Sequence, residues 1–161
     1  MKAMTIAPER PDQPDVVVLL SASDKFHAAL YPSESNYLVD VAGLLLSNVR
    51  FFVVRDANRQ AVGCGGFLLS REDDTVIAEL KRMWVDPGVR GSGIGQRLLA
   101  ALEAAAIDEG AIFVRLETGI RQPQALALYR AAGYRERDPF GSYAADPLSL
   151  FMEKPVGRNE R

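Results

Sequence analysis

A glycine-rich loop between a strand pattern and a helix pattern constrains this chain more than any other segment. The loop reads Arg90-Gly91-Ser92-Gly93-Ile94-Gly95. From the end of this loop onward, apolar residues recur at helical spacing, at Ile94, Leu98, Ala101, Leu102 and Ala105. The first turn of a helix leaves backbone N–H groups unpaired, and its dipole favours an anion there. Glycines leave room for a bulky anion to reach the backbone, and Arg90 adds positive charge. The segment therefore predicts a cradle for a phosphate or pyrophosphate.

Two common phosphate loops do not match this cradle. A P-loop requires Gly-Lys followed by Ser or Thr, and the loop lacks that sequence. A dinucleotide fingerprint places its third glycine three residues after the second, whereas Gly91, Gly93 and Gly95 are each two residues apart. The remaining alternative is a tight strand-to-helix turn whose glycines serve the backbone geometry alone.

Composition indicates one soluble domain. The chain has 161 residues, 48% of them hydrophobic and 25% charged, with a net charge of −2. We therefore expect a single domain over residues 1–161, with residues 1–14 as a flexible N-terminal arm because three prolines interrupt that stretch. A nearly neutral chain has no overall positive charge that would attract nucleic acid or an anionic membrane. No apolar run in the sequence is long enough to span a bilayer. One cysteine, Cys64, excludes intrachain disulfides and a cysteine zinc cluster. We expect a cytoplasmic monomer or homodimer.

The apolar pattern predicts strands and helices around one mixed sheet. Strands are expected at residues 16–20, 51–54, 61–69, 75–85, 112–117, 134–137 and 148–154. Helices are expected at residues 24–31 and 33–46, from Ile94 up to Gly110, and from Pro123 up to Gly133. Gly63, Gly65 and Gly66 indicate a bulge or a close backbone approach within the strand that contains them.

Three segments, in order, resemble the GNAT superfamily of acyl-CoA-dependent N-acyltransferases. The glycine loop is similar to the signature Arg/Gln-x-x-Gly-x-Gly/Ala, and the similarity extends back through residues 79–85 and forward through residues 126–134. The resemblance implies an α/β (α+β) GNAT-like fold. Its mixed, mostly antiparallel sheet has six to seven strands, is splayed at the centre and is flanked by about four helices. It also implies acetyl-CoA as co-substrate and no metal.

The resemblance further implies where the cofactor binds. The pyrophosphate would contact backbone N–H groups of the loop, and the pantetheine would pair with the strand before it. The implied cofactor-binding residues are Met83, Trp84, Val85, Arg90, Gly91, Ser92, Gly93, Ile94, Gly95, Gln96 and Gln122. Gln122 departs from the family pattern, which commonly has an asparagine seven residues before the helix tyrosine.

Acetyl transfer needs a neutral amine, yet an alkylammonium is deprotonated in only about 1 in 2,500 molecules at pH 7. Glu79 is the candidate catalytic base, and strict alternation puts it on the same side of its strand as Lys81, Met83 and Val85 unless a bulge intervenes. The alternative is a structural ion pair of Glu79 with Lys81, Arg82 or another sheet residue.

Tyr129 resembles the catalytic acid of the family, a phenol near the cofactor sulfur. The alternative is an aromatic residue on the core stripe of its helix, and a phenol can serve both roles. A backbone N–H group within residues 83–85 would stabilise the oxyanion.

The acceptor is expected between residues 31–36 and 140–146, with Tyr31, Glu34 and Tyr143 as candidate substrate-binding residues. The expected function is N-acetyl transfer from acetyl-CoA to a primary amine of a small molecule, amino acid or peptide by direct attack in a ternary complex. The alternatives are a non-catalytic sensor that binds acyl-CoA and an acetyltransferase acting on proteins or peptides.

Overall fold

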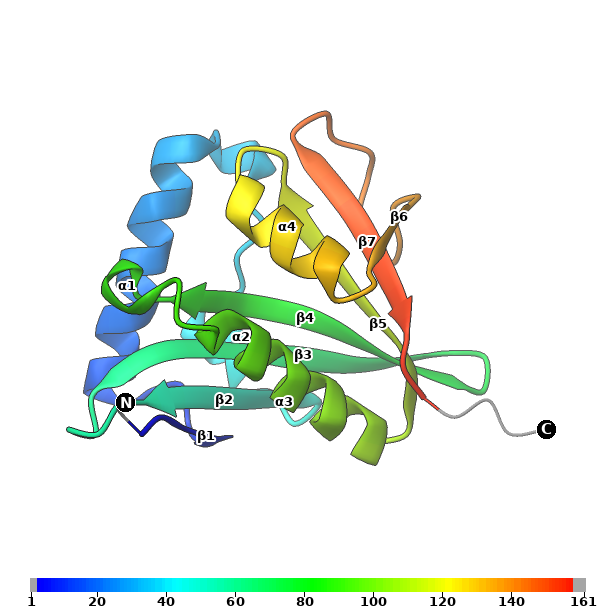
Figure 1. The fold of residues 1–161 in the computed structure, drawn as a ribbon. Coiled ribbons are helices and arrows are strands. Elements are labelled where there is room, and N and C mark those ends of the chain that lie inside the picture. Colours follow the sequence, from blue (N-terminus) through cyan, green and yellow to red (C-terminus); the bar gives the residue numbers. More distant parts are fainter. Residues whose placement is uncertain (1–2, 158–161) are drawn as a thin grey trace.

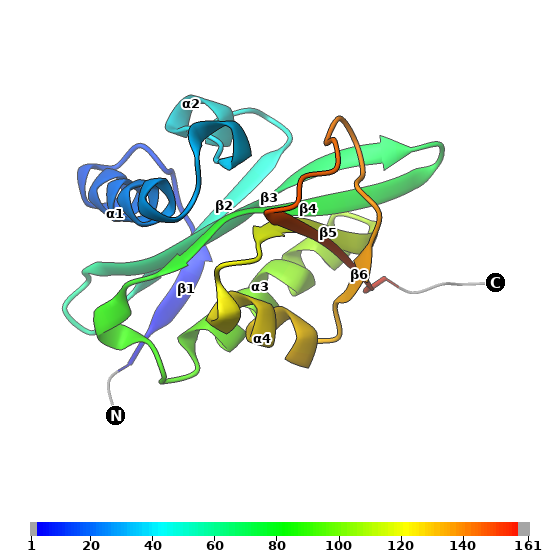
Figure 2. The ribbon, with the colours of Figure 1, turned by 90° about the horizontal axis from the view of Figure 1, so that it is seen from above.

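A seven-stranded sheet with helices on both faces forms the protein, as shown by a computed structural model that describes residues 3–157. The strand order is β1-β2-β3-β4-β5-β7-β6, and β4 and β5 are the parallel pair within it. In Figure 2, α1 and α2 cover one face while α3 and α4 cover the other. The sheet is mixed and mostly antiparallel, which confirms the expected fold class.

The helices and strands follow one another along the chain as Figure 1 shows. They are β1 (Thr5–Pro8), α1 (Pro14–Leu30), the 3₁₀ turn η1 (Ser33–Ser35), α2 (Val41–Leu44), β2 (Val49–Arg55), β3 (Ala61–Glu72), β4 (Thr75–Val85), the 3₁₀ turn η2 (Pro87–Val89), α3 (Ile94–Asp108), β5 (Ala111–Gly119), α4 (Pro123–Ala131), β6 (Arg135–Arg137) and β7 (Ser149–Pro155). No helix within residues 3–157 is long and apolar enough to cross a membrane.

Two hydrophobic cores hold the helices to the sheet. The core beneath α3 and α4 includes Phe67, Leu98, Leu102, Val114 and Met152, all fully buried. The core beneath α1 and α2 contains Val16, Leu20, Val53, Cys64 and Trp84. Burial of apolar surface on both faces explains why the central strands read as nearly continuous apolar runs.

The sheet opens between its two parallel strands. Residue pairing between β4 and β5 begins at Val76 with Ala111 and ends at Glu79 with Arg115. Beyond that point β4 continues beside β3 and β5 continues beside β7, so their remaining residues diverge. The splay expected at the centre of the sheet is therefore present.

A bulge in β4 changes which side chains face each core. Between Cys64 and Gly66 the register of β3 advances two residues, while β4 advances three, from Trp84 to Lys81. Arg82 takes up the extra residue with a φ of 59°. A Cβ on Gly65 would lie 2.9 Å from the Met83 Cγ, so the glycine permits this close approach. The bulge predicted from the glycines of β3 is confirmed.

The bulge corrects the strict alternation expected for β4. Met83 and Val85 pack with Leu80 against the core of α3 and α4. Glu79 alternates with Leu80 and therefore lies on the opposite face. Glu79 does not share a side with Met83 and Val85, because the extra residue at Arg82 reverses the pattern.

The N-terminal third differs most from the sequence prediction. Residues 16–20, predicted as a strand, belong to α1, which also contains the helix predicted at residues 24–31. Valines favour strands, yet Val16 and Leu19 are buried while Val18 is 69% exposed, which is a helical period. The predicted helix at residues 33–46 consists only of η1 and α2, with extended backbone between them.

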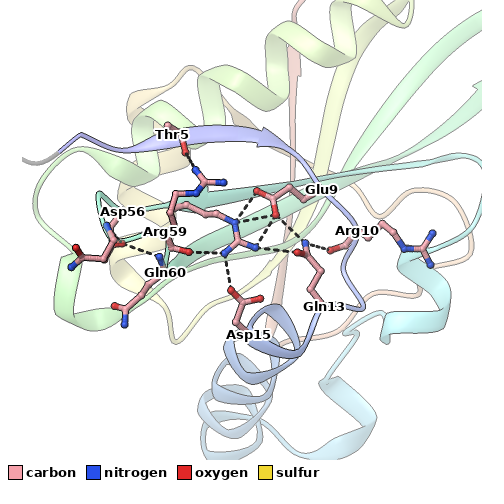
Figure 3. A network of polar contacts seen from close by, with 10 residues as sticks. Thr5, Glu9, Arg10, Gln13, Asp15, Asp56, Arg59 and Gln60 are labelled. Atoms are coloured by element: carbon pink, nitrogen blue, oxygen red, sulfur yellow. Dashed lines mark hydrogen bonds and ion pairs between the residues drawn. The ribbon is translucent and has the colours of Figure 1, made fainter.

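The flexible arm expected over residues 1–14 is also corrected within residues 3–14, while residues 1–2 lie outside the described residues. Residues 5–8 form β1, which pairs with β2 antiparallel. Arg55 then fixes the segment that follows, because its guanidinium donates to Glu9 at 2.8 Å and to Asp15 at 2.7 Å. Figure 3 shows Glu9, Gln13 and Asp15 converging there from the start of α1 and the chain before it. This network ties β1 and α1 to β2.

Candidate active site

A cleft opens where β4 and β5 diverge. Its volume is about 90 Å³, and residues of α1, the segment after it, β4, β5 and α4 line it. The lining includes His27, Tyr31, Tyr37, Lys81, Arg82, Met83, Glu117, Gly119, Gln122 and Tyr129. The splay therefore joins the face of α3 and α4 to the face of α1 through a gap in the sheet.

The glycine loop holds a row of free backbone donors at the start of α3. Among residues 3–157, no hydrogen bond is donated by the N–H groups of Gly91 through Gln96. Gly91 and Gly93 have φ values of 87° and 82°, which favour glycine. Gly93 is the N-cap of α3 and offers no side-chain cap. The row forms a concave set of donors that fits an anion.

The space around these donors is open. A Cβ on Gly91 would meet no atom within 4 Å, and one on Gly93 would meet only the Gln96 Oε1 at 3.9 Å. The Ser92 hydroxyl turns away and donates to the Val89 carbonyl oxygen at 2.7 Å. Ile94 is buried and anchors the helix start, and Gly95 approaches Leu128 of α4. The loop thus presents backbone rather than side chains.

Arg90 does not point its charge into this row. Its Nε donates to the Val85 carbonyl oxygen at 2.8 Å, and its guanidinium lies 4.6 Å from the centre of the Trp84 ring. Trp84 is buried in the core beneath α1 and α2. Arg90 therefore braces the end of β4 against the loop.

Along the cleft, residues 80–85 of β4 pair with no strand on the side of β5 in the part of the chain that the structure describes. Met83 lines the cleft there. An edge of this kind can pair with an extended ligand that carries amide groups. The row of donors and this edge together fit a ligand that has both a diphosphate and an extended amide arm, as acetyl-CoA has.

Tyr129 projects into the cleft from α4. Its ring packs 5.8 Å from the ring of Tyr134, and the residue is only 7% exposed. Burial raises the pKa of its phenol, and the charge of Glu117 adds to that rise. The hydroxyl therefore stays protonated at neutral pH and can donate a proton.

Glu79 is engaged outside the cleft lining. Its Oε2 lies 2.9 Å from the Lys81 Nζ and accepts from the Tyr143 hydroxyl at 2.6 Å. The Lys81 Nζ also donates to the Tyr143 hydroxyl at 2.8 Å. The structure therefore brings together Glu79 and Tyr143, which the sequence had placed in different roles, both directly and through Lys81.

A second carboxylate, Glu117, lies in the cleft itself. It sits near the carboxyl end of β5, and its Oε2 accepts from the Ser149 hydroxyl at 2.7 Å. Burial raises the pKa of this carboxyl, while Ser149 and Lys81 lower it. Glu117 is not among the candidate residues predicted from the sequence, although a carboxylate at the end of a buried strand is a signal that ligand sites often show.

The acceptor candidates separate in the structure. Tyr31 lines the cleft, whereas Glu34 lies on η1, exposed and outside the lining. Tyr143 packs against Tyr37 and Phe140 rather than lining the cleft. Only Tyr31 of the three is placed to touch a molecule bound in the cleft.

A chain of hydrogen bonds links Tyr31 to α1 and α4. The Tyr31 hydroxyl donates to the Gln122 Oε1 at 3.1 Å, and the Gln122 Nε2 lies 3.3 Å from the His27 Nε2. The His27 Nδ1 is 2.7 Å from the Ser23 carbonyl oxygen, so this nitrogen carries the proton. Burial lowers the pKa of His27, in agreement with a neutral ring. Gln122 is thereby held by α1.

Comparisons with known proteins agree with this geometry. The family model described as Acetyltransferase (GNAT) domain matches residues 47–136. The chain is 45% identical to the IAA acetyltransferase of Azospirillum brasilense over 97% of its own length and 100% of that protein. A Klebsiella pneumoniae structure described as an acyl-CoA N-acyltransferase has a TM-score of 0.80 and 38% identity, covering 95% of this chain and 97% of that one.

A more distant structure shows the same fold. The PaiA N-acetyltransferase of Thermoplasma acidophilum, solved in complex with coenzyme A, has a TM-score of 0.72 and 18% identity. The similarity covers 95% of this chain and 99% of that one.

Proposed function

This chain belongs to the GNAT family of N-acetyltransferases, and on that premise we propose that it moves the acetyl group of acetyl-CoA to a primary amine. The transfer is a direct attack in a ternary complex, and the acceptor is a small molecule or the amine of an amino acid or peptide. The observation that carries this proposal is the row of unpaired N–H groups from Gly91 to Gln96 beside the open edge of β4.

The row supports a diphosphate site, because unpaired N–H groups at a helix start attract negative charge. The open edge, with Met83, Trp84 and Val85, supports pairing with the pantetheine amides. Acetyl-CoA supplies the activated thioester, and the relative from Thermoplasma acidophilum was solved with coenzyme A. Arg90 contributes by bracing the loop, and Gln96, in the first turn of α3, is placed to add a side-chain contact.

A side chain of α4 and the backbone of β4 support the chemistry at the thioester end. Tyr129 keeps its proton at neutral pH and lies in the cleft, so it can protonate the departing sulfur. The N–H groups of residues 83–85 are fixed dipoles that can stabilise the oxyanion. Gln122 orients the start of α4, which carries Tyr129, through its bonds to Tyr31 and His27.

The size of the cleft supports a small acceptor. Its cavity of about 90 Å³ is narrow, and aromatic rings flank it at Tyr31, Tyr37 and Tyr129. Aromatic faces favour a cationic amine. The relative from Azospirillum brasilense is named for IAA, so that compound belongs among the acceptors to be tried.

A thiol-release screen tests the proposal. The purified protein is incubated with acetyl-CoA and with separate pools of alkylamines, amino acids, polyamines, aminoglycosides, peptides and IAA, and mass spectrometry identifies the acetylated product. We expect release of coenzyme A above the rate of hydrolysis with at least one pool of primary amines. Tight binding of acetyl-CoA without turnover of any pool would instead favour the sensor, and turnover restricted to peptides would favour the protein-modifying alternative.

A further inference from the structure

We infer that Glu117, near the carboxyl end of β5, is the catalytic base that takes the proton from the acceptor amine. The inference deepens the proposed function and rests on it. Nothing in the glycine-loop signature identifies this residue, since it lies on a different strand from the loop and from Glu79.

Glu117 occupies the gap that the splay opens. The last paired residue of β5 against β4 is Arg115, so Glu117 is two residues beyond the point where the strands separate. It lines the cleft together with Tyr129. A base and an acid thus reach one cavity from two elements, β5 and α4, which is the arrangement that acyl transfer needs.

The carboxylate of Glu117 has a free oxygen. Its Oε2 accepts from the Ser149 hydroxyl, and within residues 3–157 no donor is bonded to its Oε1. The Ser149 bond orients the group without neutralising it, because a hydroxyl carries no charge. An amine bound in the cleft can therefore donate to Oε1.

Glu79 is less suited to the same task. Its carboxylate is paired with the Lys81 ammonium and also accepts from Tyr143. Protonating Glu79 would leave the charge of Lys81 without its partner in a site where both side chains are 14% exposed. We therefore assign Glu79 a positioning role, in which it holds Lys81 and Tyr143.

The charged groups that act on Glu117 lie on β4 and in the loop before β7. Lys81 of β4 lowers its pKa, whereas Glu79 of β4 and Asp146 of the loop before β7 raise it, and burial raises it most. Neutral phenols complete the surroundings, at Tyr31, Tyr37, Tyr129 and Tyr143. A carboxyl shifted upward from its ordinary value of 4.5 is a better base near neutral pH than an ordinary one.

The step conserves atoms and electrons. The lone pair of the neutral amine forms a bond to the thioester carbonyl carbon, and Glu117 takes one proton from that nitrogen. The carbon–sulfur bond breaks with its electron pair on sulfur, and Tyr129 gives sulfur its proton. Glu117 then returns a proton to Tyr129 through solvent, so an amine and acetyl-CoA yield an amide and free coenzyme A.

The test compares Glu117→Gln with Glu79→Gln, using the fastest alkylamine of the screen as acceptor. Loss of the base is expected to lower kcat/KM about 100- to 10,000-fold in Glu117→Gln. Affinity for acetyl-CoA, measured by calorimetry, is expected to stay unchanged, because the carboxylate does not touch the glycine loop. Glu117→Asp should recover part of the rate.

The pH profile separates a base from a structural group. The acceptor ammonium, with a pKa of about 10.4, gives log(kcat/KM) a slope of one through neutral pH. Below the pKa of Glu117 the wild-type slope should rise to two, and Glu79→Gln should keep that break. In Glu117→Gln the slope should remain one throughout. A wild-type rate or an unchanged break in Glu117→Gln would overturn the inference.

A direct titration keeps this test separate from the proposed function. Carboxyl ¹³C resonances of glutamate-labelled protein are followed with pH, and Glu117→Gln assigns the signal of Glu117. We expect a pKa above the ordinary 4.5. If the wild-type protein acetylates no amine, the proposed function fails; a Glu117 carboxyl titrating at or below 4.5 overturns the inference whichever result the screen gives.

Discussion

Tyr129 combines a buried ring with a hydroxyl in the cleft, and the two roles can be tested separately. Its ring packs with that of Tyr134, whose own hydroxyl donates to Glu103 at 2.8 Å, away from the cleft lining. A phenol with a raised pKa is protonated at neutral pH, so removing the hydroxyl removes a proton donor and leaves the packing in place.

Tyr129→Phe is therefore expected to lower kcat about 100-fold while the Kd for acetyl-CoA stays the same. Steady-state kinetics and calorimetry measure the two quantities. Tyr134→Phe is the matched control, because it removes a neighbouring hydroxyl and should leave kcat near the wild-type value. Equal turnover in Tyr129→Phe and wild type would remove the assignment of Tyr129 as the acid.

At the same scale, the sequence predicted some site residues and missed others for a physical reason. Tyr129 and the glycine loop carry local patterns, and the structure places Tyr129 in the cleft lining and the loop at the start of α3. The local signal of Glu117, a carboxylate near the end of a buried strand, is weak, because the place of this residue depends on where β4 and β5 separate, and their pairing over 76–79 depends on long-range contacts. The ion pair between Glu79 and Lys81 is the structural alternative that the sequence offered. The strict alternation of side chains predicted for β4 is wrong, because the bulge at Arg82 adds one residue to the strand.

Among the elements, the loop before α3 depends on backbone shape more than on side chains. Gly93 has a φ of 82°, and its first-turn neighbours offer unpaired N–H groups. If an alanine at position 93 kept this φ, its Cβ would add bulk beside the unpaired N–H groups. If the alanine adopted another φ, the N–H groups would change direction. Either response weakens a diphosphate site.

Gly93→Ala is expected to weaken acetyl-CoA binding at least tenfold, as measured by calorimetry. The left-handed conformation itself costs about 1–2 kcal/mol with a Cβ. Gly141→Ala is the control for that cost, because Gly141 has a φ of 58°, an open surrounding and no place in the cleft lining. The proposal of a backbone diphosphate site would be refuted if both variants bound acetyl-CoA as tightly as the wild type.

Whether a segment is a helix or a strand was predictable where the period of its apolar residues agreed with the length of the segment, as in β3, β4, α3 and α4. The prediction failed for α1, because the valine-rich start of this helix has the same apolar pattern as a buried strand of five residues. The exposure of Val18 in the structure shows the helical period. The prediction failed again at residues 33–46, where Gly43 shortens α2 to four residues. The strand β1 was not predicted, because its four residues are too few to show an apolar period.

For the molecule as a whole, Arg55 joins the N-terminal segment to the sheet. Its guanidinium, with 8% of the side chain exposed, bonds to Glu9 and Asp15. The hydrogen bond from Arg55 is the main reason that the pKa of Glu9 is lowered from 4.5. Because the folded carboxyl has the lower pKa, its stabilising effect is present above pH 4.5 and is lost as pH falls through the folded value.

Glu9→Gln is therefore expected to lower the free energy of unfolding by about 1 kcal/mol at pH 7, a figure reduced for solvent screening. The difference from wild type should shrink as pH falls below 4.5, as urea unfolding at several pH values would show. Glu136→Gln removes the exposed ion pair with Arg130 and should change stability little at any pH. A loss in Glu9→Gln that stayed constant with pH would contradict the role given to this carboxylate.

The two faces of the sheet contribute different parts of the candidate site. The glycine loop and α4 belong to one face, while α1 and the segment after it approach the cleft from the other (Figure 2). The splay between β4 and β5 is the passage between them, so the thioester and the amine would meet inside the sheet. This division follows from topology, which no single sequence segment contains.

The most direct measurement is a crystal structure of the protein with coenzyme A. We predict diphosphate oxygens at about 2.7–3.2 Å from backbone nitrogens within Gly91–Gln96, and the pantetheine arm along residues 80–85 of β4. A diphosphate bound at any other surface, with those nitrogens left to water, would contradict the central claim.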